Sequence, residues 1–361
     1  MRRDRESANL DVLRATAVML VLFAHVSIFF GWAENARLNP HALGILGVLF
    51  FFVHTSLVLM FSLERQERRY GRSRMFPLFI TRRVFRIYPL CVFALAAICL
   101  FRIPSADLGL RSLRFLPPDA VGLAGNALLV QNLVDRPSVL GVMWSLPYEM
   151  QMYVLLPALF LLAGRARSVW ALLALWAGAF ALALAQPHIG GVPDFFVYVP
   201  CFVPGILAYY LSSRVKATLP FALFPALLAA LAVAYMFFWT PGTAGVVPGM
   251  VVCLTLGLLL PRFVEVRNAR VRRAGQLVAK YSYGIYITHY FALWVAFMLL
   301  PEAPVLLQAL VFVAIVVALP VALFHALESP MIGVGNKVAA RFAAPVAAPV
   351  PEPAAEAAPA G

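Results

Sequence analysis

Apolar runs of about twenty residues alternate with short polar and basic stretches along almost the whole chain. A hydrocarbon layer about 30 Å thick needs roughly 20 apolar residues of α-helix to cross it. Runs of this length therefore predict membrane-spanning helices, and we expect an all-α, polytopic membrane protein with about ten transmembrane helices. The predicted helices cover residues 10–31, 42–63, 77–101, 143–163, 168–186, 195–212, 219–239, 244–260, 281–300 and 304–327.

The stretches between the runs complete the expected organisation. The first run is longer than the apolar core of a signal peptide, so we expect it to be retained as a helix. Basic loops at 64–74 and 261–280 follow the second and eighth runs, and the polar segment 102–142 contains a short apolar piece near 120–134. We expect one transmembrane domain over residues 1–330 and a disordered, Ala/Pro-rich cytoplasmic tail over residues 331–361.

Composition excludes a soluble protein, and charge orients the helices. The chain is 63% hydrophobic and only 12% charged, whereas soluble domains carry about 25% charged residues. Because cytoplasmic loops carry the excess of basic residues, the net charge of +13 predicts topology and no nucleic-acid partner. Of the 29 lysines and arginines, 24 fall on the N-terminal side of the predicted membrane and five on the other side: Arg37, Arg102, Arg111, Arg114 and Arg136. Both termini are therefore predicted to be cytoplasmic, with the chain in the inner membrane.

Ionisable side chains within the first run are the first candidates for a functional site, because such groups are costly inside a membrane. Arg14 and His25 are eleven residues apart, which places them on one helix face about 16 Å apart. Asp11 lies one turn before Arg14, close enough to pair with it. An interhelical hydrogen bond is the structural alternative for His25.

A second group of candidates stands at the start of the third run. Arg82, Arg83 and Arg86 share one helix face at spacings of three and four residues, with Tyr88 just beyond them. Guanidinium groups at this depth are suited to a phosphate-bearing ligand that arrives from the cytoplasm. The alternative is that these arginines only mark the cytoplasmic side of the membrane.

The remaining intramembrane polar groups lie on later runs and on the second. Glu149 stands in the fourth run, close to Trp144 and Ser145, and needs a histidine or arginine partner from another helix, or forms a purely structural pair with an arginine. Further possible lining residues are Tyr286 and His289 on the ninth run, Glu328 at the end of the tenth, and His54 on the second. An interhelical hydrogen bond explains His54 at least as well as catalysis. The four cysteines lack metal-type spacing, so no metal site is expected.

These segments, in this order, resemble the acyltransferase-3 family of integral membrane acyltransferases. The similarity runs through NLDVLRATAVMLVLFAH, which carries the Arg-x10-His pattern, then GVLFFFV, RRVFRIYP, WSLPYEMQMYVLLP, YSYGIYITHY and ESP. It covers nearly the whole chain before the tail. One departure follows FFFV, where the family usually continues Ser-Gly-Phe and this chain has His54, Thr55 and Ser56. This departure puts the usual packing of the second helix in doubt. The chain also shows no soluble C-terminal partner domain of the kind that some members carry.

The resemblance implies an acyl-CoA donor, most often acetyl-CoA, and an acceptor hydroxyl on a glycan, a glycolipid or a small natural product. No permanently bound cofactor is implied. Arg82, Arg83 and Arg86 would hold the phosphates of the donor, and Arg14 would line the route of its pantetheine arm. His25 would act as general base, and Glu149 would orient its imidazole.

Two alternatives remain open at this point. A covalent acyl-histidine intermediate would give a two-step transfer, although we favour direct transfer to the acceptor. A proton-coupled carrier or exporter would use the same intramembrane histidine, glutamate and arginine groups. A carrier has no particular need for the cytoplasmic arginine cluster together with a histidine on the first helix, and this combination favours the enzyme.

Overall fold

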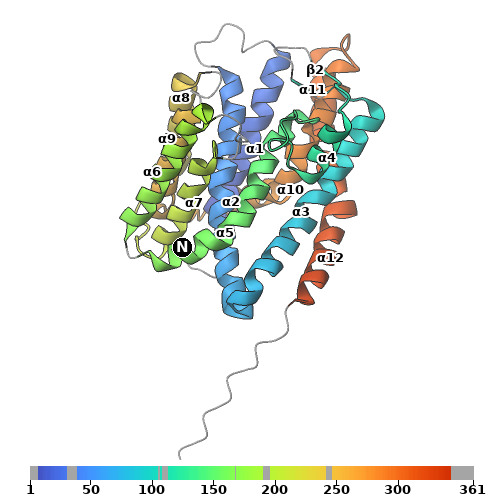
Figure 1. The fold of residues 1–361 in the computed structure, drawn as a ribbon. Helices are drawn as coiled ribbons and strands as arrows, with labels where there is room; N and C mark the ends of the chain where they lie inside the picture. Colours follow the sequence, from blue (N-terminus) through green and yellow to red (C-terminus); the bar gives the residue numbers. More distant parts are fainter. Residues whose placement is uncertain are drawn as a thin grey trace, which may run out of the picture.

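The computed structural model describes residues 7–30, 39–104, 106–107, 113–166, 168–189, 196–240 and 246–342 (Figure 1). Helices dominate this part of the chain, as the pattern of apolar runs predicts. The α-helices are α1 (Ala8–Phe29), α2 (Pro40–Tyr70), α3 (Arg72–Phe101), α4 (Ala120–Leu128), α5 (Leu146–Arg165), α6 (Val169–Ala185), α7 (Val199–Ser212), α8 (Leu223–Phe238), α9 (Val246–Leu259), α10 (Ala269–Leu293), α11 (Val305–Leu323) and α12 (Ser329–Ala340). Short helical turns are η1 (Gly141–Ser145), η2 (Gln186–His188), η4 (Leu260–Arg262), η5 (Trp294–Met298) and η6 (Phe324–Glu328).

The helices form an all-α, polytopic membrane protein, which confirms the predicted fold class. Six described helical segments are long and apolar enough to cross a membrane, and three shorter apolar helices, α7, α8 and α9 with η4, join them. The predicted ninth crossing is α10, whose first turns are rich in arginine. In Figure 1 these helices stand side by side, and α3 begins at the same end of the bundle at which α12 ends.

Two of the predicted basic loops are mostly helical. Helix α2 continues through the charged residues to Tyr70, where Arg68 pairs with Glu64 one turn away at 2.7 Å. Gly71, with a φ of 79°, then reverses the chain directly into α3, because glycine tolerates a left-handed backbone. Likewise, α10 begins at Ala269, where the side chain of Asn268 caps its first N–H groups.

Helical structure also continues past the predicted end of the transmembrane domain at residue 330. The π-helical turn η6 leads from α11 directly into α12, with Pro330 in its first turn, and α12 ends at Ala340. Gly335 lets this helix pack against the ring of Phe85 on α3. Residues 343–361 of the expected tail lie outside the described residues.

The described parts of the segment between α3 and α5 lie beside the opposite end of α3 (Figure 1). Two two-residue strands, β1 (Ala106–Asp107) and β2 (Leu113–Arg114), pair in antiparallel fashion. Asp119 caps α4 through the N–H of Gly122 and accepts a hydrogen bond from Arg136 at 3.0 Å, and both contacts hold the pKa of Asp119 below its usual value. The predicted apolar piece 120–134 thus contains α4, a short helix that lies across this end.

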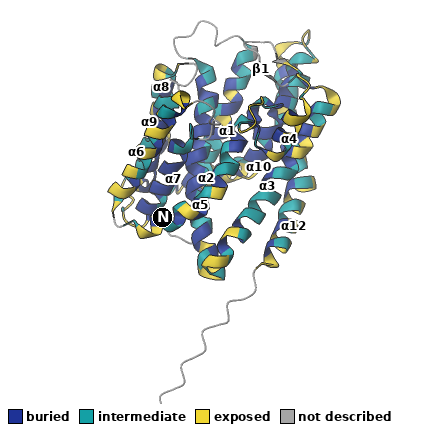
Figure 2. Ribbon diagram, in the orientation of Figure 1, coloured by how far each residue is buried: buried dark blue, intermediate teal, exposed yellow. Residues whose placement is uncertain are grey.

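Helix α2 is the centre of the bundle (Figure 2). In its most apolar stretch, 78% of the residues are buried, compared with 17% in the corresponding stretch of the segment formed by α11 and α12. The unusual Ser56 contributes to this packing, because its hydroxyl donates to the carbonyl of Phe202 on α7 at 2.7 Å. Gly205 of α7 lies directly against Ser56 and the backbone of α2. Ser56 and Gly205 therefore allow close approach of these two helices.

We expect Gly205→Ala to lower the stability of the folded protein. A Cβ atom at this position would collide with Ser56 and with the backbone at Val53, so helix α7 would have to move away. Overpacking of this kind costs about 1–3 kcal/mol, measurable as a lower melting temperature in detergent. Gly178→Ala on α6 is the matched control, since nothing lies within 4 Å of its added methyl group. Equal melting temperatures of the two variants would contradict the packing role of Gly205.

Candidate active site

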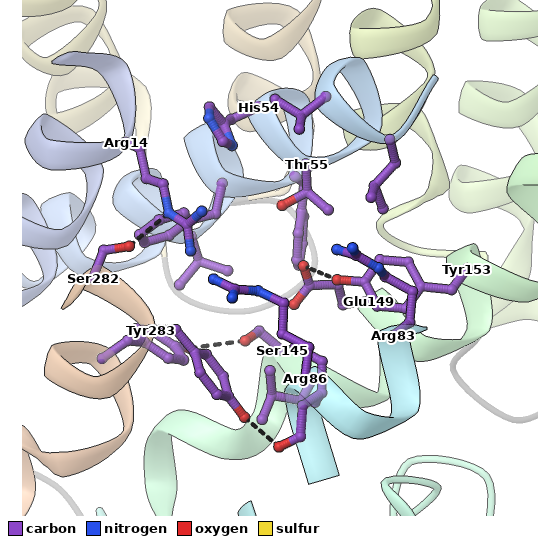
Figure 3. A pocket seen from close by; sticks show the side chains of 18 residues that line it. Arg14, His54, Thr55, Arg83, Arg86, Ser145, Glu149, Tyr153, Ser282 and Tyr283 are labelled. Carbon is purple, nitrogen blue, oxygen red and sulfur yellow. Dashed lines mark hydrogen bonds between the residues drawn. The ribbon is translucent and has the colours of Figure 1, made fainter. Parts of the chain in front are cut away.

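A cavity of about 90 Å³ lies between α1, α2, α3, α5 and α10, within the membrane-spanning part of the bundle (Figure 3). Five helices contribute to it, so its lining comes together only when the chain folds. Its polar lining residues are Arg14, His54, Thr55, Arg83, Arg86, Ser145, Glu149, Tyr153, Ser282, Tyr283 and Tyr286. Apolar side chains of α2, among them Val48, Phe51 and Val58, line the rest.

Three guanidinium groups dominate the charge of this cavity. Arg14 donates from Nε to the hydroxyl of Ser282 at 2.6 Å, and Arg83 and Arg86 reach in from α3. The Nε–H of Arg83 is buried and has no hydrogen-bond partner among the described residues. Glu149 is the one carboxylate in the lining, so the cavity keeps an excess of positive charge. Half-buried cations this close together need compensating negative charge, and one carboxylate supplies only part of it.

The wall formed by η1 and α5 is held by tyrosine hydroxyls. Tyr153 donates to the carboxylate of Glu149 at 2.6 Å, one turn away on the same helix. Tyr286 of α10 donates to the carbonyl of Val142 at 2.7 Å and lies 2.8 Å from the hydroxyl of Ser145. These bonds fix the position of Glu149 and of the Tyr286 ring, while Glu149 interacts electrostatically with Arg83.

His25 lies beyond the cavity, against a second histidine. Its ring centroid is 4.8 Å from that of His289 and 5.2 Å from that of Tyr290, both on α10. His25 Nδ1 is 2.8 Å from the carbonyl of Val21, and His289 Nδ1 is 2.8 Å from the carbonyl of Tyr286. Because a carbonyl oxygen only accepts, each neutral ring carries its hydrogen on Nδ1 and its lone pair on Nε2. Both lone pairs are thereby prepared to accept a proton.

Comparison with known protein families supplies the class of chemistry. The family model of an acyltransferase domain matches residues 7–325, which include the arginine cavity and both histidines. The chain belongs to the acyltransferase-3 family. No curated protein and no solved structure matched the chain. The family match shows that the protein is a membrane acyltransferase.

The fold of the acyltransferase brings about half of the predicted site residues together. Those that line the cavity are Arg14, His54, Arg83, Arg86, Ser145, Glu149 and Tyr286. Within the described part of the chain, Asp11, His25, Arg82, Tyr88, Trp144, His289 and Glu328 lie outside that lining. Arg82 is the neighbour of Arg83 on α3, and its Nε–H is likewise buried without a hydrogen-bond partner among the described residues.

Other predicted lining residues of the acyltransferase have structural contacts elsewhere. The hydroxyl of Tyr88 donates to the carbonyl of Leu128 at 2.8 Å and so connects α3 to the end of α4. The Trp144 ring packs against Tyr198 at 5.2 Å. Glu328 is buried at 2% exposure in η6, where its carboxylate lies next to Gly284 of α10.

That Glu149 orients His25 stays a prediction. Glu149 lines the same cavity as Arg14, and His25 lies eleven residues beyond Arg14, a rise of about 16 Å along α1. The carbonyl of Val21 accepts a hydrogen bond from the His25 imidazole. In the cavity, Glu149 balances part of the arginine charge.

Sequence reasoning did not single out Ser282 and Tyr283 of the acyltransferase. Ser282 partners Arg14, and the hydroxyl of Tyr283 donates to the carbonyl of Ile87 on α3 at 2.7 Å. A signal was present, since Ser282, Tyr286 and His289 recur at the four- and three-residue spacings of one helix face. The packing of α1 against α10 shows which residues this face contacts.

Proposed function

We propose that this acyltransferase transfers an acyl group, acetyl in the first instance, from cytoplasmic acyl-CoA to a hydroxyl group. The acceptor would be a glycan, a glycolipid or a small natural product, and the site of action the inner membrane. One observation carries the proposal: a cavity lined by three arginines lies on the same face of α1 as His25, about 16 Å nearer the N-terminal end.

The arginine cavity supports an acyl-CoA donor because guanidinium groups bind phosphate oxygens in a bidentate manner. We assign Arg83 and Arg86 to the phosphates, with Arg82 beside them and Arg14 further in. A cavity volume of about 90 Å³ suits the thin pantetheine arm, so the bulky nucleotide stays at the cytoplasmic mouth. The arm then carries the thioester toward His25.

His25 acts as the general base in this scheme. Its Nε2 lone pair accepts the proton of the acceptor hydroxyl while the oxygen attacks the thioester carbonyl carbon. The new C–O bond forms, the C–S bond breaks, and the thiolate of CoA takes up the proton from His25 as it leaves. Transfer is direct in this scheme, and trapping an acylated His25 with labelled acyl-CoA in the absence of acceptor would replace it by a two-step route.

Glu149→Gln is expected to lower acyl transfer on the order of 10²-fold with little change in melting temperature. The amide oxygen can still accept from Tyr153, but the cavity loses its negative charge and Arg83 and Arg86 shift. Misplacing bound groups by 1 Å costs about 10²-fold in rate. The control is Glu67→Gln, since Glu67 pairs with Arg72 outside the cavity. Unchanged turnover in Glu149→Gln would remove Glu149 from the site.

The proposal is tested by the melting temperature of the purified protein against rising acetyl-CoA concentration. A ligand at 100 times its Kd stabilises the folded state by about 2.7 kcal/mol, which is visible as a saturable shift. Release of free CoA without any transmembrane gradient would then demonstrate transfer. If millimolar acyl-CoA produces no shift, the acyl-CoA proposal fails and gradient-driven uptake by a carrier becomes the experiment to run.

A further inference from the structure

Two aromatic rings stand at the end of the cavity that lies nearer the histidines. Phe51 of α2 and Tyr286 of α10 meet edge to face, with ring centroids 6.0 Å apart, and both line the cavity. The Tyr286 ring also lies 6.4 Å from the ring of His289. We call this pair the Phe51–Tyr286 constriction. It separates the arginine cavity from His25 and His289.

The order of residues along α2 places the constriction on the route between the two regions. The cavity lining on α2 runs from Leu59 to Val48, a rise of about 16 Å. Phe51 is one turn from the end of that lining. Gly44 lies one further turn beyond Val48, where a Cβ atom would be 3.9 Å from Cε1 of His25.

A direct path between α1 and α2 is closed. An added Cβ at Gly47 would come within 2.5 Å of the carbonyl of Ala17 and 2.9 Å of the Val21 side chain, so the two helices touch here. This contact lies between the levels of Arg14 and His25. A group that travels from the arginines to the histidines between α2 and α10 passes the ring pair.

Of the two rings, Phe51 sets the width. Tyr286 is held by Val142 and Ser145 on its hydroxyl, and only 6% of it is exposed. Phe51 is half-buried although its neighbours Phe50 and Phe52 are at most 2% exposed, because its ring faces the cavity. Shortening Phe51 would thus widen the passage without breaking a hydrogen bond.

We propose that the Phe51–Tyr286 constriction selects the donor by the cross-section of its acyl group. Unbranched acyl groups have the width of the pantetheine arm's own methylene chain and pass between the rings. Acyl groups branched at the carbon next to the carbonyl are stopped at Phe51. This inference rests on the proposed function, because it presupposes an acyl-CoA donor in the arginine cavity.

n-Butyryl-CoA and isobutyryl-CoA test the proposal, since they have the same atoms and differ only in branching. We expect the purified protein to bind n-butyryl-CoA about tenfold or more tightly than isobutyryl-CoA, the scale at which apolar pockets resolve one methylene group. Isobutyryl-CoA should bind no better than free CoA, because its acyl group stays outside. Dissociation constants come from titrated melting temperatures.

Phe51→Ala and the milder Phe51→Leu should bring the two affinities close together by improving isobutyryl-CoA binding relative to that of free CoA. The matched control is Phe61→Ala on the same helix, where the ring packs against Tyr209 outside the cavity. It should keep the wild-type ratio. Equal affinities in the wild type, or an unchanged ratio in both Phe51 variants, would overturn the constriction while free CoA binding still supports the donor site. If the wild-type protein binds none of these CoA compounds, the proposed function itself is refuted.

Discussion

Replacing His25 with alanine is expected to abolish acyl transfer while donor binding persists. General-base catalysis contributes about 10²–10⁴-fold, and alanine has no group that can accept the proton. The Nδ1–H of His25 is held by the Val21 carbonyl at 2.8 Å, so its Nε2 lone pair is aligned before any substrate arrives. The measurement is release of free CoA at saturating acetyl-CoA, alongside the melting-temperature shift that reports binding.

The control for His25 is His41→Ala. His41 lies in the first turn of α2, with its ring 6.0 Å from Trp239, outside the cavity lining. It should leave turnover unchanged. His25→Asn adds a second check, because the shorter amide keeps a donor for the Val21 carbonyl but lacks a basic nitrogen. Turnover retained in either His25 variant would exclude the general-base role.

The double variant Arg83→Ala/Arg86→Ala is expected to weaken acetyl-CoA binding by about 10²–10⁴-fold. Hydrogen bonds to charged groups contribute about 1.5–3 kcal/mol each, and two arginines would lose at least two of them. The ligand-free variant should stay folded, because Arg14 remains in the cavity to interact with Glu149. Its own melting temperature without ligand is the baseline for the binding shift.

Arg165→Ala separates this effect from a general loss of positive charge. Arg165 stands in the last turn of α5, donates to the carbonyl of Leu161, and does not line the cavity. Its removal should leave acetyl-CoA affinity unchanged. If the double variant also binds acetyl-CoA normally, Arg83 and Arg86 act as topology signals and the donor site lies elsewhere.

Patterns along single helices were predictable from the sequence, and contacts between helices were not. Apolar run length predicts the membrane helices because the bilayer sets a minimum length for each crossing. Run length does not predict how far a helix extends into water. Helix α2 therefore ends later than predicted and α3 begins earlier, on the two sides of Gly71. Spacing likewise placed Arg14 and His25 on one face of α1, as the cavity lining and the His289 contact agree.

The candidate site was harder to predict where partners come from different helices. The sequence left a histidine or an arginine open as the partner of Glu149, and the packing of α5 against α2 and α3 brings it to the arginines. The contact between His25 and His289 depends on α1 and α10 lying side by side, which no spacing within either helix encodes. Family resemblance named both histidines without indicating that they touch.

The Gly71 reversal has a consequence for how the donor arrives. Helices α2 and α3 contain 31 and 30 residues, or about 45 Å of helix each, some 15 Å more than the hydrocarbon layer. The extra turns of α2 and α3 on either side of Gly71 extend into water and form a positively charged projection. They carry Arg65, Arg68, Arg69, Arg72 and Arg74. An acyl-CoA donor of the kind we propose is polyanionic and would feel this field within a screening length of about 8 Å at physiological salt. We therefore expect its capture to slow as ionic strength rises, while chemistry in the enclosed interior does not sense the bulk electrolyte.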